Sequence, residues 1–288
     1  MNRTQLWRIF SLCILAALTT STPARGQNSF AYVVNNFETA DSSSSALWMY
    51  RVDRSTGLLT PNGSIPFGVG ESPLSLASDP HNRFLYIANS FSISGYSIDP
   101  IAGTLSPLPS SPFSAPTPWA VAVHPSGKFL YAAGGTSGVA LYSLDAAGIS
   151  TFITRTAAVN GGATALTIDP SGRFLYTAEL TANTASFYTI DKNSGTLTLA
   201  GQVSTGPLPG SVALTPSGNF LFVPNENGQS VSVYSIDSSS GVPTPVPGSP
   251  FATGLVPRAA VVTPSGSFVY IVESGHSTIS AFTGVYYR

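Results

Sequence analysis

Apolar and polar residues alternate with a period of two along much of the chain, and this alternation returns at a nearly constant interval. The segment Asp79–Tyr86, a polar turn followed by Phe-Leu-Tyr, recurs as His124–Tyr131 and then three more times. The prolines of this turn lie at positions 80, 125, 170, 216 and 264, which is a step of 45 to 48 residues. Sustained helical periodicity is absent, so the repeat predicts strands.

A second column of residues follows the same interval. It consists of an aromatic residue (Tyr50, Tyr96, Tyr142, Tyr188, Tyr234, Phe282), a carboxylate three residues later (Asp53, Asp99, Asp145, Asp191, Asp237) and then a glycine (Gly57, Gly103, Gly148, Gly195, Gly241). Each repeat divides into an innermost strand, a Pro-Ser-Gly-type turn, a Phe-Leu-Tyr strand, an alternating third strand and a weaker outer strand. Four strands in about 45 residues are typical of a β-propeller blade, and we expect an all-β propeller of four-stranded blades.

Counting the expected strands gives 22, which corresponds to about six blades. The segment Asn28–Asn35 enters as a second strand, so we expect the first repeat to lack an innermost strand. The last repeat reaches Phe282 and a short tail, so we expect it to lack an outer strand. Since propellers usually hide their sheet edges by closing on themselves, closure of the ring is left open at this point.

The N-terminal segment has the pattern of a secretory signal peptide. Arg3 and Arg8 precede the short apolar run Ile9–Leu18, and Gly26 offers a small residue directly before Gln27. This run is too short to span a bilayer, and no later stretch resembles a membrane span.

We therefore expect residues 1–26 to be a signal peptide and residues 27–288 to form a single propeller domain that is exported to the periplasm or the cell exterior. Cys13, the one cysteine, would leave with the signal peptide, so no disulfide is expected in the mature protein.

Composition narrows the range of functions. Only 9% of residues are charged and the formal net charge is −1, while glycine and proline number 27 and 23. Because lysine and arginine are never clustered, nucleic acid is not an expected partner. No histidine or cysteine cluster has metal-ligand spacing and no glycine-rich phosphate loop precedes a helix, so we expect neither a metal nor a cofactor.

The blade motifs also resemble a known family. Phe-Leu-Tyr followed by small residues, then Tyr-x-Ile-Asp and Gly-Thr-Leu at Gly103 and Gly195, are similar to the lactonase-type seven-bladed propellers, which include bacterial 6-phosphogluconolactonase. Surface propellers named for a Tyr-Val-Thr-Asn repeat share this signature. The resemblance covers nearly all of residues 30–288 and implies a propeller fold and lactone hydrolysis.

Strand directions predict which loops share a face. The loop before each first strand and the loop after each second strand lie on one face, opposite the Pro-Ser-Gly turns. Second strands end at Asn35, Asn89, Gly134, Glu179, Asn225 and Glu273, and first strands open at Leu74, Trp119, Thr164, Gly210 and Arg258. A charge present in only one or two copies of a repeat indicates a candidate site.

Hydrolysis of a lactone needs a base that deprotonates water and a cation or donor that stabilises the oxyanion. We assign these catalytic roles to Glu179 and Arg258. Substrate-binding candidates on the same face are Glu273, Trp119, Asn225 and Asn89.

Structural roles compete with these assignments. The asparagines are also suited to capping loops, and the two glutamates to standing as solvated carboxylates at a loop edge. Arg258 is equally suited to an ion pair with Glu273 or with another carboxylate on the rim.

The family resemblance bears on the two catalytic candidates. In active members of the family that this chain resembles, Pro-Arg-His precedes an inner strand and Asn-Glu-Leu follows the next strand. Ala178-Glu179-Leu180 keeps the glutamate and leucine, and Pro257-Arg258-Ala259 keeps the proline and arginine. Histidine is absent from every such position in this chain.

The remaining conspicuous polar residues are expected to be structural. The Asp53 column belongs to hairpin turns, in which an aspartate bonds its own backbone. His81 and His124 lie in the turn before the second strand, and His276 is expected to be a solvated loop residue.

Two functions remain open at this stage. One is an exported lactone hydrolase, whose substrate is an uncharged or extracellular lactone or a similar sugar-like ligand. The other is a non-catalytic module outside the cytoplasm that recognises a protein or a glycan. The oligomeric state is undetermined by the sequence.

Overall fold

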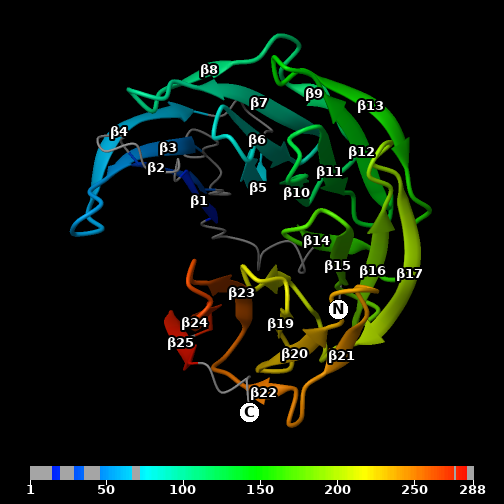
Figure 1. The fold of residues 1–288 in the computed structure, drawn as a ribbon. Coiled ribbons are helices and arrows are strands. Elements are labelled where there is room, and N and C mark those ends of the chain that lie inside the picture. The colour runs from blue at the N-terminus through cyan, green and yellow to red at the C-terminus, as the bar shows by residue number, and fades with distance from the viewer. Residues whose placement is uncertain (1–14, 20–28, 36–45, 67–71, 276, 284–288) are drawn as a thin grey trace, which may run out of the picture. The chain divides into compact units, whose positions relative to one another are not determined.

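A computed structural model describes residues 15–19, 29–35, 46–66, 72–275 and 277–283, and of residues 15–19 it describes the backbone. These residues contain 25 strands and no helix, and the strands form six blades of a β-propeller (Figure 1). The predicted all-β propeller of about six blades is confirmed.

Blades 1 and 2 have antiparallel strands in chain order. Blade 1 contains β1 (Leu15–Thr19), β2 (Ser29–Asn35), β3 (Ala46–Val52) and β4 (Leu59–Pro66). Blade 2 contains β5 (Pro73–Ser78), β6 (Phe84–Asn89), β7 (Ser92–Ile98) and β8 (Leu105–Pro107), with the short β9 (Phe113–Ser114) also paired to β7.

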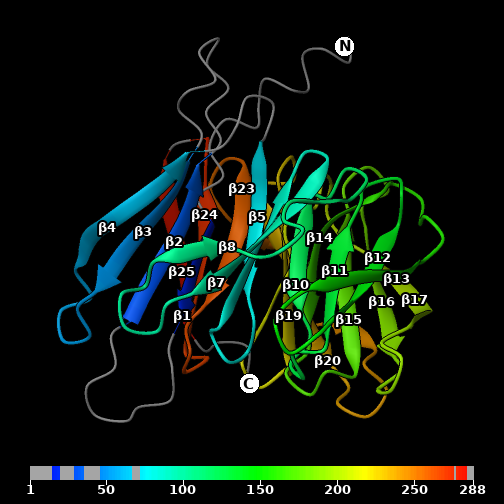
Figure 2. The same cartoon turned by 90° about the horizontal axis from the view of Figure 1, so that it is seen from above.

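Blades 3 and 4 follow the same order along the chain. Blade 3 contains β10 (Ala120–Val123), β11 (Phe129–Ala133), β12 (Val139–Leu144) and β13 (Ser150–Arg155). Blade 4 contains β14 (Ala163–Ile168), β15 (Phe174–Glu179), β16 (Thr184–Ile190) and β17 (Leu197–Ser204), which lie side by side in Figure 2.

Blades 5 and 6 complete the described strands. Blade 5 contains β18 (Ala213–Leu214), β19 (Phe220–Asn225), β20 (Ser230–Ile236) and β21 (Pro243–Pro245), with β22 (Phe251–Ala252) also paired to β20. Blade 6 has three described strands, β23 (Pro257–Val262), β24 (Phe268–Glu273) and β25 (Thr278–Thr283).

The structure has three strands that the sequence pattern did not predict, namely β1, β9 and β22. Strand β1 pairs with β2 in the register Leu15↔Val34 to Thr19↔Phe30, so the expectation that the first repeat lacks an innermost strand is wrong. A short apolar run suits an innermost strand as well as the core of a signal peptide, because both environments favour apolar residues.

The chain divides into two compact units, one of residues 1–123 with 144–151 and the other of residues 124–143 with 152–288. A core cluster of the first unit joins blades 1 and 2 through Tyr32 and Ile87, and a cluster of the second joins blades 4 and 5 through Tyr176 and Val223. The single domain over residues 27–288 stays a prediction.

A recurring contact connects consecutive blades within each unit. The second-strand tyrosine of one blade donates its hydroxyl to the glycine carbonyl of the next blade's Asp-x-x-x-Gly turn, at 2.7–2.9 Å (Tyr32 to Gly103, Tyr86 to Gly148, Tyr131 to Gly195, Tyr176 to Gly241). The phenylalanine two residues earlier covers the same glycine, which leaves no room for a Cβ there. We call this pair of contacts the blade lock.

The aspartates of these turns have the role that the sequence predicted. Each accepts backbone N–H bonds from residues two to four positions later, as Asp53 does from Ser55 and Thr56. The hydroxyl of Ser55, together with the backbone N–H groups of Thr56 and Ser55, lowers the pKa of Asp53 to about 2. Each turn glycine has a positive φ of 70–78°, a conformation in which a side chain is strained.

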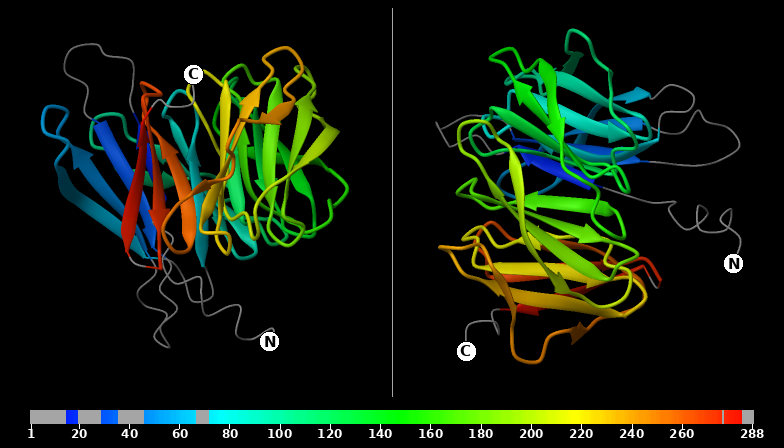
Figure 3. Two further views of the ribbon diagram at one scale, coloured as in Figure 1. Left: turned by 90° about the horizontal axis from the view of Figure 1, so that it is seen from below. Right: turned by 90° about the vertical axis from the view of Figure 1, so that its right-hand side faces the viewer.

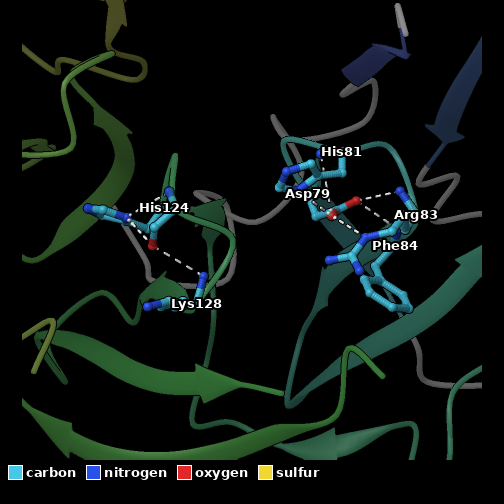
Figure 4. Close-up of polar contacts among 7 residues, drawn as sticks. Asp79, His81, Arg83, Phe84, His124 and Lys128 are labelled. Atoms are coloured by element: carbon cyan, nitrogen blue, oxygen red, sulfur yellow. Dashed lines mark hydrogen bonds and ion pairs between the residues drawn. The ribbon is translucent and has the colours of Figure 1, made fainter. Parts of the chain in front are cut away.

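The Pro-containing turn before the second strand is also held by its first residue. Asp79 accepts the backbone N–H groups of Arg83 and Phe84 on one carboxylate oxygen (Figure 4). His124 accepts the N–H of Ser126 at Nδ1, and its Nε2 donates to the carbonyl of Gly172, since a carbonyl can only accept. The predicted turn role of His124 is therefore confirmed.

Candidate functional site

A buried polar side chain ends the second strand in four of the blades and bonds to hydroxyl groups that open the third strand. Asn89 bonds Ser92 and Ser94, Glu179 bonds Thr184, Asn225 bonds Ser230 and Ser232, and Glu273 bonds Thr278 and Ser280. The sequence assigned all four to catalysis or substrate binding. Their shared geometry gives each a part in fixing the connection between the second and third strands, and those assignments stay predictions.

Glu179 ends β15 and is 0% exposed. Its carboxylate accepts the hydroxyls of Thr177 and Thr184, but burial outweighs these bonds and raises its pKa to about 7. The expectation that Glu179 is a solvated carboxylate at a loop edge is wrong.

Glu273 ends β24 and is likewise buried, so the same correction applies to it. One carboxylate oxygen accepts the backbone N–H of Gly254 at 2.8 Å and the hydroxyl of Ser280, and the other accepts Thr278 at 2.7 Å. Both oxygens of this buried carboxylate therefore have hydrogen-bond donors in a site away from water.

Asn89 and Asn225 donate through Nδ2 to their serine hydroxyls. The Oδ1 atom of each is buried and has no hydrogen-bond partner among the described residues. The predicted loop-capping role of the asparagines is therefore borne out by these bonds.

Arg258 forms a partly exposed ion pair between blades 5 and 6. Its Nη1 lies 3.3 Å from Oε1 of Glu226, which directly follows β19, and its Nε donates to the hydroxyl of Ser274 at 3.1 Å. The sequence predicted an ion pair with Glu273 or another rim carboxylate, and the structure selects Glu226.

Local backbone geometry places both members of this pair. Between β23 and β24 the register passes from Pro257↔Glu273 to Ala259↔Val272, so Arg258 has no partner in the ladder and is displaced from it. Opposite, Gly210 leaves the space that the carboxylate of Glu226 fills, since a Cβ there would stand 2.3 Å from Oε1.

Glu226 is the site residue that the sequence analysis missed. Burial raises its pKa, and the charge of Arg258 opposes that rise. The side chains of Glu226 and Arg258 retain 13% and 15% exposure, so the ion pair is partly open to solvent. The available signal was Asn225-Glu226, which keeps the first two residues of the Asn-Glu-Leu pattern one position beyond the column that we compared.

The hydrogen bonds and the ion pair described for Arg258 and Glu226 do not include the other candidate residues from the sequence. Glu179 and Arg258 bond to different residues. Trp119 is half-buried and belongs to the first compact unit, whereas the pair belongs to the second. His276 lies outside the described residues.

The part of the chain that the structure describes contains no group of three or more histidine, cysteine, aspartate or glutamate residues that could hold a metal ion. No helix in that part is long and apolar enough to cross a membrane.

Comparison with models of known protein families shows to which family the chain belongs. The model described as "Lactonase, 7-bladed beta-propeller" matches residues 31–151 and 147–254, well over half of the sequence. The chain belongs to the lactonase seven-bladed β-propeller family. With six described blades, it differs from the blade number in the family's description.

Solved structures similar to this family member share its fold. A candidate 6-phosphogluconolactonase from Bacteroides uniformis has a TM-score of 0.77 at 20% identity, over 88% of this chain and 77% of that one. A periplasmic gluconolactonase from Pseudomonas aeruginosa has a TM-score of 0.77 at 19% identity, over 93% and 80%. A protein of unknown function from Desulfotomaculum acetoxidans reaches 0.73 at 17% identity, over 91% and 84%. Comparison with curated proteins found no match.

Proposed function

We propose that the protein hydrolyses an uncharged lactone of the sugar-acid type, with Glu226 and Arg258 as the reacting pair. The observation that carries this proposal is the ion pair itself, a carboxylate and a guanidinium 3.3 Å apart whose side chains are both partly exposed. Membership of the lactonase family supports ester hydrolysis as the class of reaction.

The pair supplies the two functions that the reaction needs. The carboxylate of Glu226 accepts a proton from water while the water oxygen bonds to the lactone carbonyl carbon. Arg258 stabilises the negative charge that develops on the carbonyl oxygen. The ring C–O bond then breaks, the leaving alkoxide takes the proton from Glu226, and the product is an open-chain hydroxy acid.

Electrostatics favour a substrate without a phosphate. Glu226 already offsets the charge of Arg258, so the pair presents no excess positive charge for a dianionic group. The name of the Pseudomonas structure, a periplasmic gluconolactonase, agrees with an unphosphorylated sugar lactone.

Glu179 remains the second candidate for the base. A pKa of about 7 is suited to proton transfer at neutral pH, as general bases require. Its complete burial separates it from bulk water. The side chain of Glu226 is partly exposed to solvent.

Export belongs to the same proposal. The basic segment, apolar run and small residues at the N-terminus support a signal peptide, and an extracytoplasmic location suits a neutral sugar lactone better than a cytosolic phosphorylated one.

The test is acid release from glucono-lactone and from a 6-phosphorylated sugar lactone, corrected for spontaneous hydrolysis. We expect turnover of the neutral lactone, reduced at least about 100-fold in Glu226→Gln and in Arg258→Met. Arg155→Met, in β13, is the matched control and should retain turnover. A loss in Glu179→Gln with normal turnover in Glu226→Gln would move the base to Glu179. Absence of turnover by the folded protein would instead favour the non-catalytic module.

A further inference from the structure

The last described blade exposes residues whose counterparts in earlier blades are buried. Phe268 is 41% exposed and Tyr270 is 38% exposed, in β24 (red in Figure 3). The counterparts of Tyr270 in blades 1 to 4 (Tyr32, Tyr86, Tyr131, Tyr176) are all 0% exposed, because each sits in a blade lock.

The exposed surface continues onto the neighbouring strand. Val272 faces Ile279 across the β24–β25 ladder, and Ile279 is 65% exposed. The equivalent pair in blade 2, Ala88 and Ile93, is fully buried. Phe268, Tyr270, Val272 and Ile279 thus form an exposed apolar sheet face, which we call the terminal face.

In the part of the chain that the structure describes, the first blade has the turn glycine of a blade lock without the tyrosine and phenylalanine that contact such a glycine in the later blades. Its turn runs from Asp53 to Gly57, and no atom of the described residues lies within 4 Å of the position that a Cβ of Gly57 would take. At the four glycines that take part in locks, the nearest phenylalanine ring atom is 2.2–2.7 Å from that position. Gly57 has the same backbone conformation as those glycines, with φ 74°. Leu59, which follows the turn, is exposed as well.

We propose that the terminal face binds the Asp53–Gly57 turn of a second copy of this chain. Phe268 of one copy covers Gly57 of the other, and Tyr270 donates its hydroxyl to the Gly57 carbonyl. The contact repeats a geometry that the chain already forms four times, so it continues an established interface. The contact is head-to-tail, because it pairs the terminal face of one copy with the Asp53–Gly57 turn of another. In a dimer, one terminal face and one Asp53–Gly57 turn therefore remain available to bind a further copy.

Burial of apolar area supplies the driving force. Four large apolar side chains gather on the terminal face, and contiguous exposed apolar patches on a protein surface mark interaction sites. The hydroxyl of Tyr270 adds the directional bond that sets the register of the contact. This inference is independent of the proposed hydrolysis.

Crosslinking between two single-cysteine variants tests the pairing. One variant carries Thr56→Cys, the other carries Ser267→Cys beside Phe268, and both carry Cys13→Ser because Cys13 is the one native cysteine. With a short bismaleimide, we expect covalent dimers in the mixture and at least about 10-fold fewer in either variant alone. Equal yields in all three samples would overturn the proposal, as would an absence of dimers.

Molar mass in solution gives a second, independent measurement. We expect the mass of the unmodified chain to rise with concentration in light scattering, and Tyr270→Arg to abolish the rise. Leu199→Arg replaces an exposed apolar residue in β17, away from the terminal face, and should leave it intact. A double Thr56→Cys/Ser267→Cys variant that crosslinks only within one chain, with a constant monomer mass, would contradict the second copy as occupant.

Discussion

At the scale of single residues, burial separates two kinds of carboxylate at or directly after the ends of second strands. Glu179 and Glu273 are enclosed and satisfied by hydroxyl and backbone donors, whereas Glu226 is held by Arg258 and keeps contact with solvent. The same residue type therefore serves blade structure in two places and is available for chemistry in a third.

The buried carboxyl of Glu179 predicts a pH-dependent stability. In the unfolded chain it ionises near its ordinary pKa of 4.5, but in the folded chain it stays protonated up to about pH 7. Unfolding therefore releases a proton between these values, and its contribution to stability falls as the pH rises from about 4.5 to about 7. A pKa difference of one unit corresponds to about 1.4 kcal/mol, so the loss in the free energy of unfolding approaches about 3 kcal/mol above pH 7.

Glu179→Gln removes this titration, and we expect the variant to be more stable than the unmodified chain at pH 8 by about 1–3 kcal/mol. Urea denaturation at pH 8 and pH 4 measures the difference. The side chain is neutral in both proteins at pH 4, so their stabilities should nearly coincide there. A variant that is less stable at pH 8 would show that the ionised carboxylate is preferred in the fold.

At the scale of strands and turns, the blade lock packs a phenylalanine ring of one blade against the turn glycine of the next, so a side chain at that glycine would collide with the ring. In Gly195→Ala the new Cβ would stand 2.7 Å from the ring of Phe129, whereas in Gly57→Ala it meets nothing within 4 Å. Both glycines have nearly the same φ, 73° and 74°, so the backbone strain of alanine is equal.

We expect Gly195→Ala to cost about 1–3 kcal/mol more than Gly57→Ala in thermal or urea denaturation of dilute protein, because the ring and turn must separate. Gly57→Ala serves as the control for strain. Equal costs for the two variants would mean that the Phe129 contact does not contribute to stability.

The sequence predicted most of these elements because repetition multiplies weak signals. One Phe-Leu-Tyr segment is ambiguous. Three such segments and two close variants, Phe220-Leu-Phe and Phe268-Val-Tyr, recur at a nearly constant interval and identify the second strands, and the Tyr-x-Ile-Asp motifs that follow identify third strands. Strands β9 and β22 were missed because two residues are too short to carry a period, and β1 because Leu15–Thr19 also fits a signal peptide.

The site was predicted only in part for a related reason. Arg258 was visible as a charge that breaks a column of the repeat. Its partner was not, because the contact with Glu226 depends on the register shift at Arg258 and on the absence of a side chain at Gly210. These are properties of two strands in space and cannot be read from one repeat.

At the scale of the whole molecule, two roles compete for Leu15–Thr19. The structure pairs it as the innermost strand of blade 1, while the sequence places it in a signal peptide that ends before Gln27. Intact mass and N-terminal sequencing of the protein recovered from an exporting bacterial host decide between them. We expect a mature chain that begins at Gln27. A secreted protein that retains residues 15–19 would contradict the predicted cleavage.

The pH dependence of kcat/KM for glucono-lactone is the most direct test of the Glu226–Arg258 pair as a hydrolytic site. We predict a rate that rises with pH as Glu226 loses its proton, with a midpoint above the ordinary pKa of 4.5 because burial raises the pKa of this carboxyl. In Glu226→Gln this limb should disappear, leaving the residual rate flat. An unchanged limb in the variant would contradict the account and assign the base to another group.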